Sequence, residues 1–337
     1  MKLKRILRQE ILWAAVIAAV LLGRLTNPYF FVRNNLDVML YTTAIYGTLA
    51  IAESLVLLVG EIDLSIGISS VVSPALAIYL ANWINQMVNG ASLVRGGYVM
   101  MPWWVIVVLT MAIATLIGLV NGIIVVKGHV PPFVATIGMQ YTVSGIGYIV
   151  TKGTPLFMTR VEGSDYLGGA KFMGLVPVCF VLFLVIAVLF IYLTTSTKFG
   201  MRVYSTGGSA KSAKLCGINT DRWKILMYII AGILVGVTSL VFISKLQSID
   251  VTQTTGYEMT ALAIAIVAGI ELNGGGGRLI DTVKGALFMA ILSNVMSNIG
   301  FLSYHRTFVT GLFIVLFAIM HKINDSKRLK ELNVVEV

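Results

Sequence analysis

The sequence predicts an all-α, polytopic membrane protein with about ten transmembrane helices. Of its 337 residues, 57% are hydrophobic and only 12% are charged, whereas a soluble domain carries about 25% charged residues. A spanning helix needs about 20 apolar residues, and ten apolar runs follow one another along the chain. Soluble enzymes are therefore excluded. Nucleic-acid binders are disfavoured, because the 25 Lys and Arg lie between apolar runs and not in a basic patch interleaved with aromatics.

The ten runs are expected to be the helices, in this order: 11–25, 36–59, 66–84, 102–126, 133–150, 174–195, 223–243, 259–272, 283–302 and 306–321. The first run follows a basic N-terminus without a small-residue cleavage site, so we expect an uncleaved helix and not a signal peptide. The run 259–272 is short for a crossing, and 133–150 is rich in Gly and Thr. Either is expected to be a half-helix or a re-entrant segment.

The distribution of charge predicts the orientation. If all ten runs cross the membrane, 17 of the 25 Lys and Arg lie on the side of the N-terminus. Cytoplasmic loops carry such an excess, so both termini are expected in the cytoplasm, with a tail at about 322–337. The basic stretch at about 196–224 is then a long cytoplasmic loop and a candidate docking site. The stretch 151–173 is a water-exposed outer loop.

The chain lacks the motifs of a catalytic or energy-converting subunit. There is no GxxxxGK[ST] phosphate loop and no GxSxG nucleophile elbow. The three His residues are far apart and have no metal-ligand spacing. The two cysteines, one in an apolar run and one in the basic loop, exclude a disulfide framework. We therefore expect no enzyme activity, no metal and no cofactor, and energy from another subunit.

Carboxylates inside and between the apolar runs are candidate functional groups. Glu61 and Asp63 lie between two runs with almost no loop, followed by Ser65. Asp63 and Ser65 either cap the next helix or line a polar pathway through the membrane, and both can hold together. Glu53 lies in the middle of a run, where it needs a partner or a proton. An alternative function is therefore an ion-coupled secondary transporter or channel that uses Glu53, Glu61 or Asp63.

Amides and glycines in later runs leave two interpretations open. Asn294 and Ser297 lie within about one turn of each other, suited either to interhelical hydrogen bonds or to the hydroxyl groups of a polyol. Asn121 lies between Gly118 and Gly122, a pattern that most often indicates close helix packing.

Two breaks in the apolar pattern have similar sequences. A run ends in Gly, an acidic residue, Leu and a small polar residue at 59–65 and again at 268–274. This similarity between the two breaks is consistent with duplicated transporter halves or with chance. The glycines 274–277 predict a turn between helices, and Pro131 with Pro132 separates two runs.

Several motifs, in this order and spacing, resemble the membrane-spanning subunits of bacterial ABC importers for monosaccharides, the ribose, xylose, arabinose and galactose permease group. The similarity covers most of the chain. The motifs are the residues from Gly60 to Gly67, Asn121 with Gly122, Pro132 to Thr136, Phe199 with Gly200, Gly207 with Gly208, Leu215 to Asn219, Gly256 to Glu258, the glycine-rich turn before Arg278, and Ser303 with Tyr304.

The resemblance implies a type II importer fold, with residues 1–337 as one transmembrane permease domain in the bacterial inner membrane. It also implies a second permease subunit, identical or different, two cytoplasmic ATPase subunits and a periplasmic or extracellular sugar-binding protein. The identity of the sugar is left open. A coupling helix for the ATPase is implied within 198–224.

Two sets of site residues follow. Gly207, Gly208 and Gly217 are expected to bracket the coupling helix, with Leu215 as its apolar contact and Ala210 where the family usually has an acidic residue after the Gly pair. The substrate pathway is expected at Asp63, Ser65, Asn121, Asn294 and Ser297.

Overall fold

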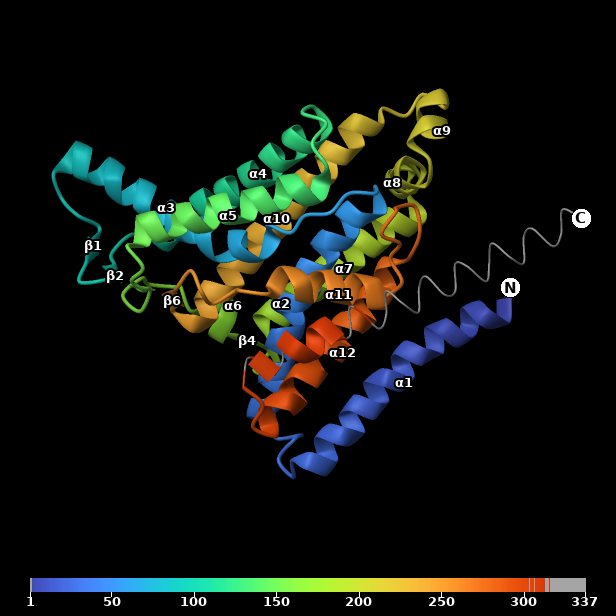
Figure 1. Cartoon of the computed structure of the whole chain (residues 1–337). Coiled ribbons are helices and arrows are strands. Elements are labelled where there is room, and N and C mark those ends of the chain that lie inside the picture. The colour runs from blue at the N-terminus through green and yellow to red at the C-terminus, as the bar shows by residue number, and fades with distance from the viewer. Residues whose placement is uncertain (1, 303, 306, 313–314, 316–337) are drawn as a thin grey trace, which may run out of the picture.

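The structure, a computed structural model, describes residues 2–302, 304, 305, 307–312 and 315 (Figure 1). Its helices are α1 (Lys2–Thr26), α2 (Arg33–Leu58), α3 (Ile66–Asn89), α4 (Trp103–Val126), α5 (Pro132–Thr151), α6 (Tyr166–Gly169), α7 (Val178–Ser196), α8 (Lys198–Gly208), α9 (Ala210–Leu215), α10 (Thr220–Leu246), α11 (Tyr257–Val267) and α12 (Leu279–Asn298). In the described part of the chain, seven of them are long and apolar enough to cross a membrane: α2, α3, α4, α5, α7, α10 and α12.

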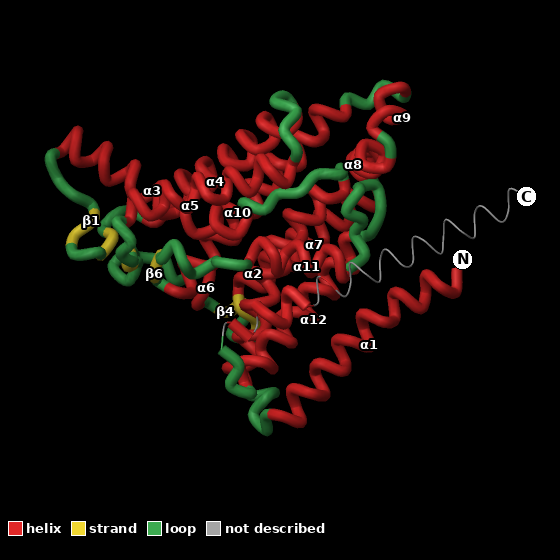
Figure 2. Tube along the Cα trace, in the orientation of Figure 1, coloured by secondary structure: helices red, strands yellow, loops and turns green. Residues whose placement is uncertain are grey.

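Short strands join the loops at one end of the bundle. They are β1 (Val94–Arg95), β2 (Tyr98–Val99), β3 (Leu156–Phe157), β4 (Lys171–Phe172), β5 (Val176–Pro177) and β6 (Ser248–Ile249). Four form a sheet in the order β1-β2-β3-β6, and β4 pairs with β5. Figure 2 shows these strands at one end of the bundle, with α8 and α9 at the other. The two ends are therefore built differently.

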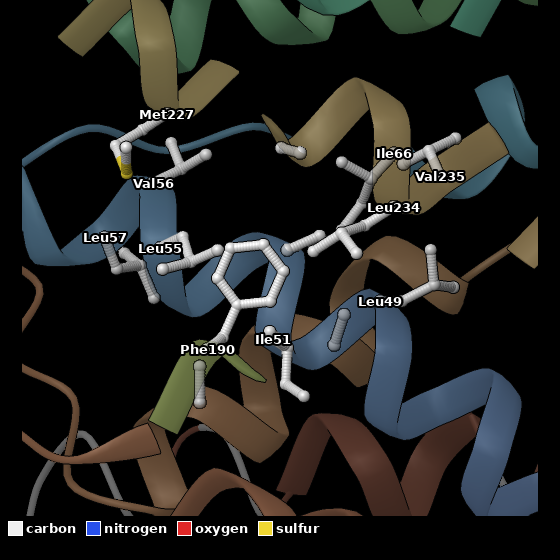
Figure 3. Packing of buried hydrophobic residues seen from close by; sticks show 14 of the residues in the cluster. Leu49, Ile51, Leu55, Val56, Leu57, Ile66, Phe190, Met227, Leu234 and Val235 are labelled. Atoms are coloured by element: carbon white, nitrogen blue, oxygen red, sulfur yellow. The ribbon is translucent and has the colours of Figure 1, made fainter. Parts of the chain in front are cut away.

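Helix α2 is the centre of the bundle. It packs against α12, α10, α11 and α7, and its second half, from Leu49 to Leu58, is buried on all sides. The main apolar cluster combines side chains of α2, α3, α7 and α10, and Figure 3 shows Phe190 of α7 directed into it among side chains from α2 and α10. A helix buried all round needs apolar residues on nearly every face, and Glu53 and Ser54 are the polar exceptions in this stretch.

Glycines bring α4 and α10 into close contact, the most extensive helix pair of the bundle. A Cβ on Gly118 would overlap the carbonyl oxygen of Tyr228, and one on Gly232 would lie 2.6 Å from the Ala114 oxygen. Gly122 packs against Tyr228 in the same crossing. Small residues allow helix backbones to approach in this way, so the packing interpretation of Gly118 and Gly122 is confirmed.

The two segments expected to be half-helices behave differently. The run 259–272 forms α11, which has only 11 residues, so that prediction is confirmed. The prediction is wrong for 133–150, which forms the 20-residue helix α5. Its threonines do not interrupt the helix, because the hydroxyl of Thr142 bonds to the Gly138 carbonyl and that of Thr151 to the Gly147 carbonyl. Pro132 is tolerated because it begins the helix.

Most of the tenth run, 306–321, and the whole tail 322–337 lie outside the described residues. The turn at 274–277 and the break at Pro131 and Pro132 are confirmed, since α11 and α12 flank the former and α4 and α5 the latter.

Candidate functional site

A non-helical segment interrupts the bundle between α2 and α3. Residues 59–65 join the end of α2 at Leu58 to the start of α3 at Ile66. Gly60 has a φ of +79°, a conformation that glycine adopts without strain. The side chains of Glu61, Asp63 and Ser65 that follow are all buried. The sequence break therefore places polar groups inside the protein and not in a solvated loop.

Asp63, Ser65 and Asn121 form one hydrogen-bonded cluster. Oδ1 of Asp63 accepts hydrogen bonds from the Ser65 backbone N–H at 3.0 Å and the Ser65 hydroxyl at 2.7 Å. The Asn121 amide, from α4, donates to Asp63 Oδ1 at 3.2 Å and to Ser65 Oγ at 2.8 Å. The structure thus joins three of the five predicted pathway residues. Ser65 makes no side-chain cap to α3, so the capping expectation is wrong for Ser65.

Glu61 is paired with a cation that sequence reasoning did not assign to it. Nζ of Lys224, near the start of α10, lies 2.5 Å from Glu61 Oε1. Burial raises the pKa of the Glu61 carboxyl above its ordinary value, while the hydrogen bond and charge of Lys224 act in the opposite direction. Nearby, the Tyr228 hydroxyl donates to the Ile62 carbonyl at 3.1 Å. Helix α10 therefore holds the interrupted segment at two points.

Glu53 of α2 lies next to this segment and is fully buried. Its Oε1 accepts only a long hydrogen bond, 3.4 Å, from the Asp63 backbone N–H. Its other oxygen has no hydrogen-bond partner. Few hydrogen bonds therefore offset the free-energy cost of removing this carboxyl group from water.

A small pocket adjoins the cluster where α3, α4 and α10 meet. It is lined by Asp63, Ser65 and Ser69 on its polar side, with Gly118 and Gly232 among the remaining lining residues. The Ser69 hydroxyl is buried there and has no hydrogen-bond partner. The pocket thus contains a hydroxyl without a hydrogen-bond partner, and its glycines leave helix backbone as part of its lining.

Asn294 and Ser297 do not belong to this cluster. Asn294 exchanges hydrogen bonds with Asn35, near the start of α2, at 2.8 and 3.2 Å, and accepts one from Asn298. The Ser297 hydroxyl donates to the Ser293 carbonyl of its own helix. Asn35 lies 23 residues before Leu58, about 35 Å along a helix. The amide network therefore ties α2 to α12 at the opposite end of α2 from Asp63.

Sequence reasoning missed a second polar contact inside the bundle. Gln140 of α5 donates to Glu258 Oε1 at 3.2 Å, and a Cβ on Gly67 would overlap the Glu258 carboxylate. The first turns of α3 and α11 therefore meet here, next to α5. Glu258 belongs to a motif that carried the family resemblance, but its partner could not be inferred from spacing alone.

The loop 196–224 contains two short helices at the end of the bundle. Helix α9 lies between the Gly207–Gly208 pair and Gly217, begins at Ala210 and is capped by the Ser209 hydroxyl, which accepts from the Ser212 N–H. Leu215, its last residue, is 83% exposed. The chain thus presents a short helix with an uncovered apolar residue beyond the bundle.

These features define a class: a multi-pass helical membrane protein with a buried polar break in its bundle and an exposed short helix beyond it. Residues 35–317 match the family described as the permease component of branched-chain amino acid transport systems, and the chain belongs to this family. It is a multi-pass membrane protein, and its relatives are transport permeases and not enzymes.

Individual relatives are named for sugars. The chain is similar to the ribose import permease protein RbsC of Escherichia coli (strain K12), 30% identical over 314 residues and covering 92% of each chain. RbsC of Bacillus subtilis (strain 168) is 29% identical, covering 90% of this chain and 89% of the relative. The xylose/arabinose import permease protein XylH of Sulfolobus acidocaldarius is 28% identical, covering 87% and 79%.

The predicted resemblance to ABC sugar permeases is therefore confirmed, and the importer interpretation is supported over the ion-coupled one. Membership of such a family implies ATPase and substrate-binding partners in general.

Proposed function

We propose that the chain is the transmembrane subunit of an ABC importer and forms a pathway for a monosaccharide across the bacterial inner membrane. The observation that carries this proposal is α9, a short helix exposed beyond the bundle in a chain without a phosphate loop. Such a helix suits a separate ATPase that supplies the energy. The relatives named for ribose, arabinose and xylose favour a pentose or similar sugar as the substrate.

The proposed assembly has two permease subunits, identical or different, two ATPase subunits on α9, and a sugar-binding protein at the end that carries the strands. Residues 1–337 form one transmembrane domain with about ten helices and both termini in the cytoplasm. This orientation is supported by the course of the described helices, because α1 starts and α11 ends at the end of the bundle where α8 and α9 lie (Figure 1). It also places the basic loop 196–224 on the cytoplasmic side.

The proposed mechanism is alternating access. Nucleotide bound to the ATPases shifts the equilibrium between the outward-open and inward-open states of the permease. The size of that shift is limited to the difference in the nucleotide's binding free energy between the two states. The ATPases therefore act by binding α9 differently in the two states. Asp63, Ser65 and Asn121 are proposed to line the pathway. Asn294 and Ser297 stay predictions, since Asn294 bonds to Asn35 of α2 and to Asn298, and the Ser297 hydroxyl donates to a carbonyl of its own helix.

Measuring which energy source drives sugar uptake tests this function. Proteoliposomes containing the purified complex, with nucleotide enclosed on the ATPase side, should accumulate labelled ribose, arabinose or xylose only with ATP and the binding protein, and uptake should survive an uncoupler. Leucine is the comparison substrate, because the family description names branched-chain amino acids. Uptake by the chain alone under a proton or sodium gradient would refute the proposal.

Docking on α9 has its own test. Leu215→Asp should abolish co-purification with the ATPase, because a charge then replaces the apolar contact, whereas Leu215→Met should retain it. Leu175→Asp is the matched control, since Leu175 is an exposed leucine, at 64%, in the turn between β4 and β5. Normal ATPase binding by the Leu215→Asp variant would contradict docking at this residue.

A further inference from the structure

Three chain segments meet through glycine backbone at the end of the bundle that carries α9. They are the end of α2 at Leu58 to Gly60, the end of α8 at Gly207 and Gly208, and the loop 271–278 before α12. The Gly275 N–H donates to the Leu58 carbonyl at 3.0 Å. A Cβ on Gly207 would overlap that same carbonyl and would lie 2.5 Å from the Gly275 nitrogen. We call this contact the glycine junction.

The junction has no side chains between its backbones. A Cβ on Gly274 would lie 2.6 Å from the Gly60 nitrogen and 2.9 Å from the Gly207 Cα. A close-packed contact of this kind has no soft layer that could absorb a displacement. One side-chain tie strengthens it, because the Tyr204 hydroxyl of α8 donates to the Gly277 carbonyl at 2.9 Å.

Helix α9 is connected to the segment 59–65 from two directions. On one side α8 leads into the junction, where Gly207 contacts the residue just before that segment. On the other side Lys214 of α9 pairs with Asp221 at 3.2 Å at the start of α10, and one turn further Lys224 of α10 pairs with Glu61. A displacement of α9 therefore reaches the break before α3 by both routes, and the loop before α12 by the first.

We propose that Gly207 is a positioning residue of the transport cycle, which passes the displacement of α9 to the segment 59–65 and to the loop 271–278 through backbone contact at the glycine junction. The inference rests on the proposed function and deepens it. The two segments it connects overlap the two stretches of similar sequence, 59–65 and 268–274, and each lies ahead of a long helix, α3 in one case and α12 in the other. Both helices would then be moved from a single point of contact.

The test measures coupling, as sugar molecules imported per ATP hydrolysed, in proteoliposomes with the complete complex. Gly207→Ala pushes α8 away from Leu58 and Gly275, and the coupling ratio should fall at least tenfold. Gly138→Ala is the matched control, because Gly138 is also helical but a Cβ there meets nothing within 4 Å. Its ratio should stay within twofold of the unsubstituted complex. A Gly207→Ala ratio within twofold of the unsubstituted complex would overturn the proposal.

If the complex with Gly207→Ala does not assemble, a milder variant tests the same proposal. Tyr204→Phe removes only the hydroxyl that bonds to Gly277, and should lower the coupling ratio at least threefold while the permease stays folded and assembled, with no greater loss of stability than one hydrogen bond accounts for. An unchanged ratio in that variant would refute the junction as a relay. Failure of the proposed function is distinct, because the unsubstituted complex itself would then import no sugar with ATP.

Discussion

Lys224 of α10 and Glu61 of the segment between α2 and α3 form an ion pair of 2.5 Å inside a protein whose described core is otherwise largely apolar. Glu61 is almost fully buried, while the Lys224 side chain keeps 25% of its surface exposed. The pair fixes the first turns of α10 to the break before α3. It therefore links the helix that follows α9 to the segment that holds Asp63.

Removing one member of the pair should cost more than removing both. Lys224→Met leaves a buried charge at Glu61 without its partner, and should lower the free energy of unfolding by about 2 kcal/mol, less than for a fully buried pair because water reaches Lys224. The double variant with Glu61→Gln should recover most of this. Thermal unfolding in detergent measures both, with Lys152→Met at an exposed lysine as control. A double variant no more stable than Lys224→Met would contradict the pairing.

Asn121 should contribute through its amide hydrogens. Asn121→Ala removes the donor shared by Asp63 and Ser65, so the free energy of unfolding should fall by about 1–3 kcal/mol. Asn121→Asp should be worse, because it sets a second carboxylate against Asp63. Asn89→Ala, at an exposed amide of α3, is the control. Equal stability of the Asn121→Ala and Asn89→Ala proteins would show that the cluster does not hold α4 to the break.

The crossing of α4 and α10 should tolerate no added side chain. Gly118→Leu drives the helix against the Tyr228 carbonyl, and overpacking of this kind costs about 1–3 kcal/mol. Gly145→Leu on α5, where a Cβ meets nothing within 4 Å, should leave the unfolding midpoint unchanged. A similar loss in both variants would mean that the effect comes from replacing glycine and not from the crossing.

Glu53 should be replaceable by a neutral isostere. Its carboxyl group is fully buried and has one oxygen without a hydrogen-bond partner, and within the described part of the chain its only hydrogen bond is the long one from the Asp63 N–H. An uncompensated charge in the membrane interior is costly, so Glu53→Gln should be at least as stable as the unsubstituted chain and should retain ATP-driven uptake. Glu53→Lys should prevent assembly. Loss of uptake in a stable Glu53→Gln protein would show that Glu53 takes part in transport.

Asn294 should act as a tie between helices. Asn294→Ala loses the exchange of hydrogen bonds with Asn35, and the free energy of unfolding should fall by about 1 kcal/mol. Uptake per folded complex should stay within twofold. A tenfold loss of uptake at unchanged stability would instead favour the pathway role suggested by the sequence.

Local properties of the chain were readable from the sequence. Seven of the ten apolar runs form helices long enough to cross a membrane in the described part of the chain, and the shortness of α11 follows from the shortness of its run. The close packing at Gly118 followed from small residues at helical spacing. In each case the cause lies within one helix or one turn, so neighbouring residues suffice to predict it. The same reasoning misjudged α5, because Gly and Thr lower helix propensity but hydroxyls can bond back to their own helix.

Contacts between distant segments were decided only by the tertiary structure. Lys224 is 163 residues from Glu61, and nothing in either local sequence names the other as its partner. Gly207 and Gly275 look like ordinary turn glycines, yet their lack of a side chain serves a contact between three backbones. Asn294, inside an apolar run, and Asp63, between two such runs, lie near opposite ends of α2. The apolar runs determine which residues leave water, whereas the packing of whole helices determines which buried polar groups meet.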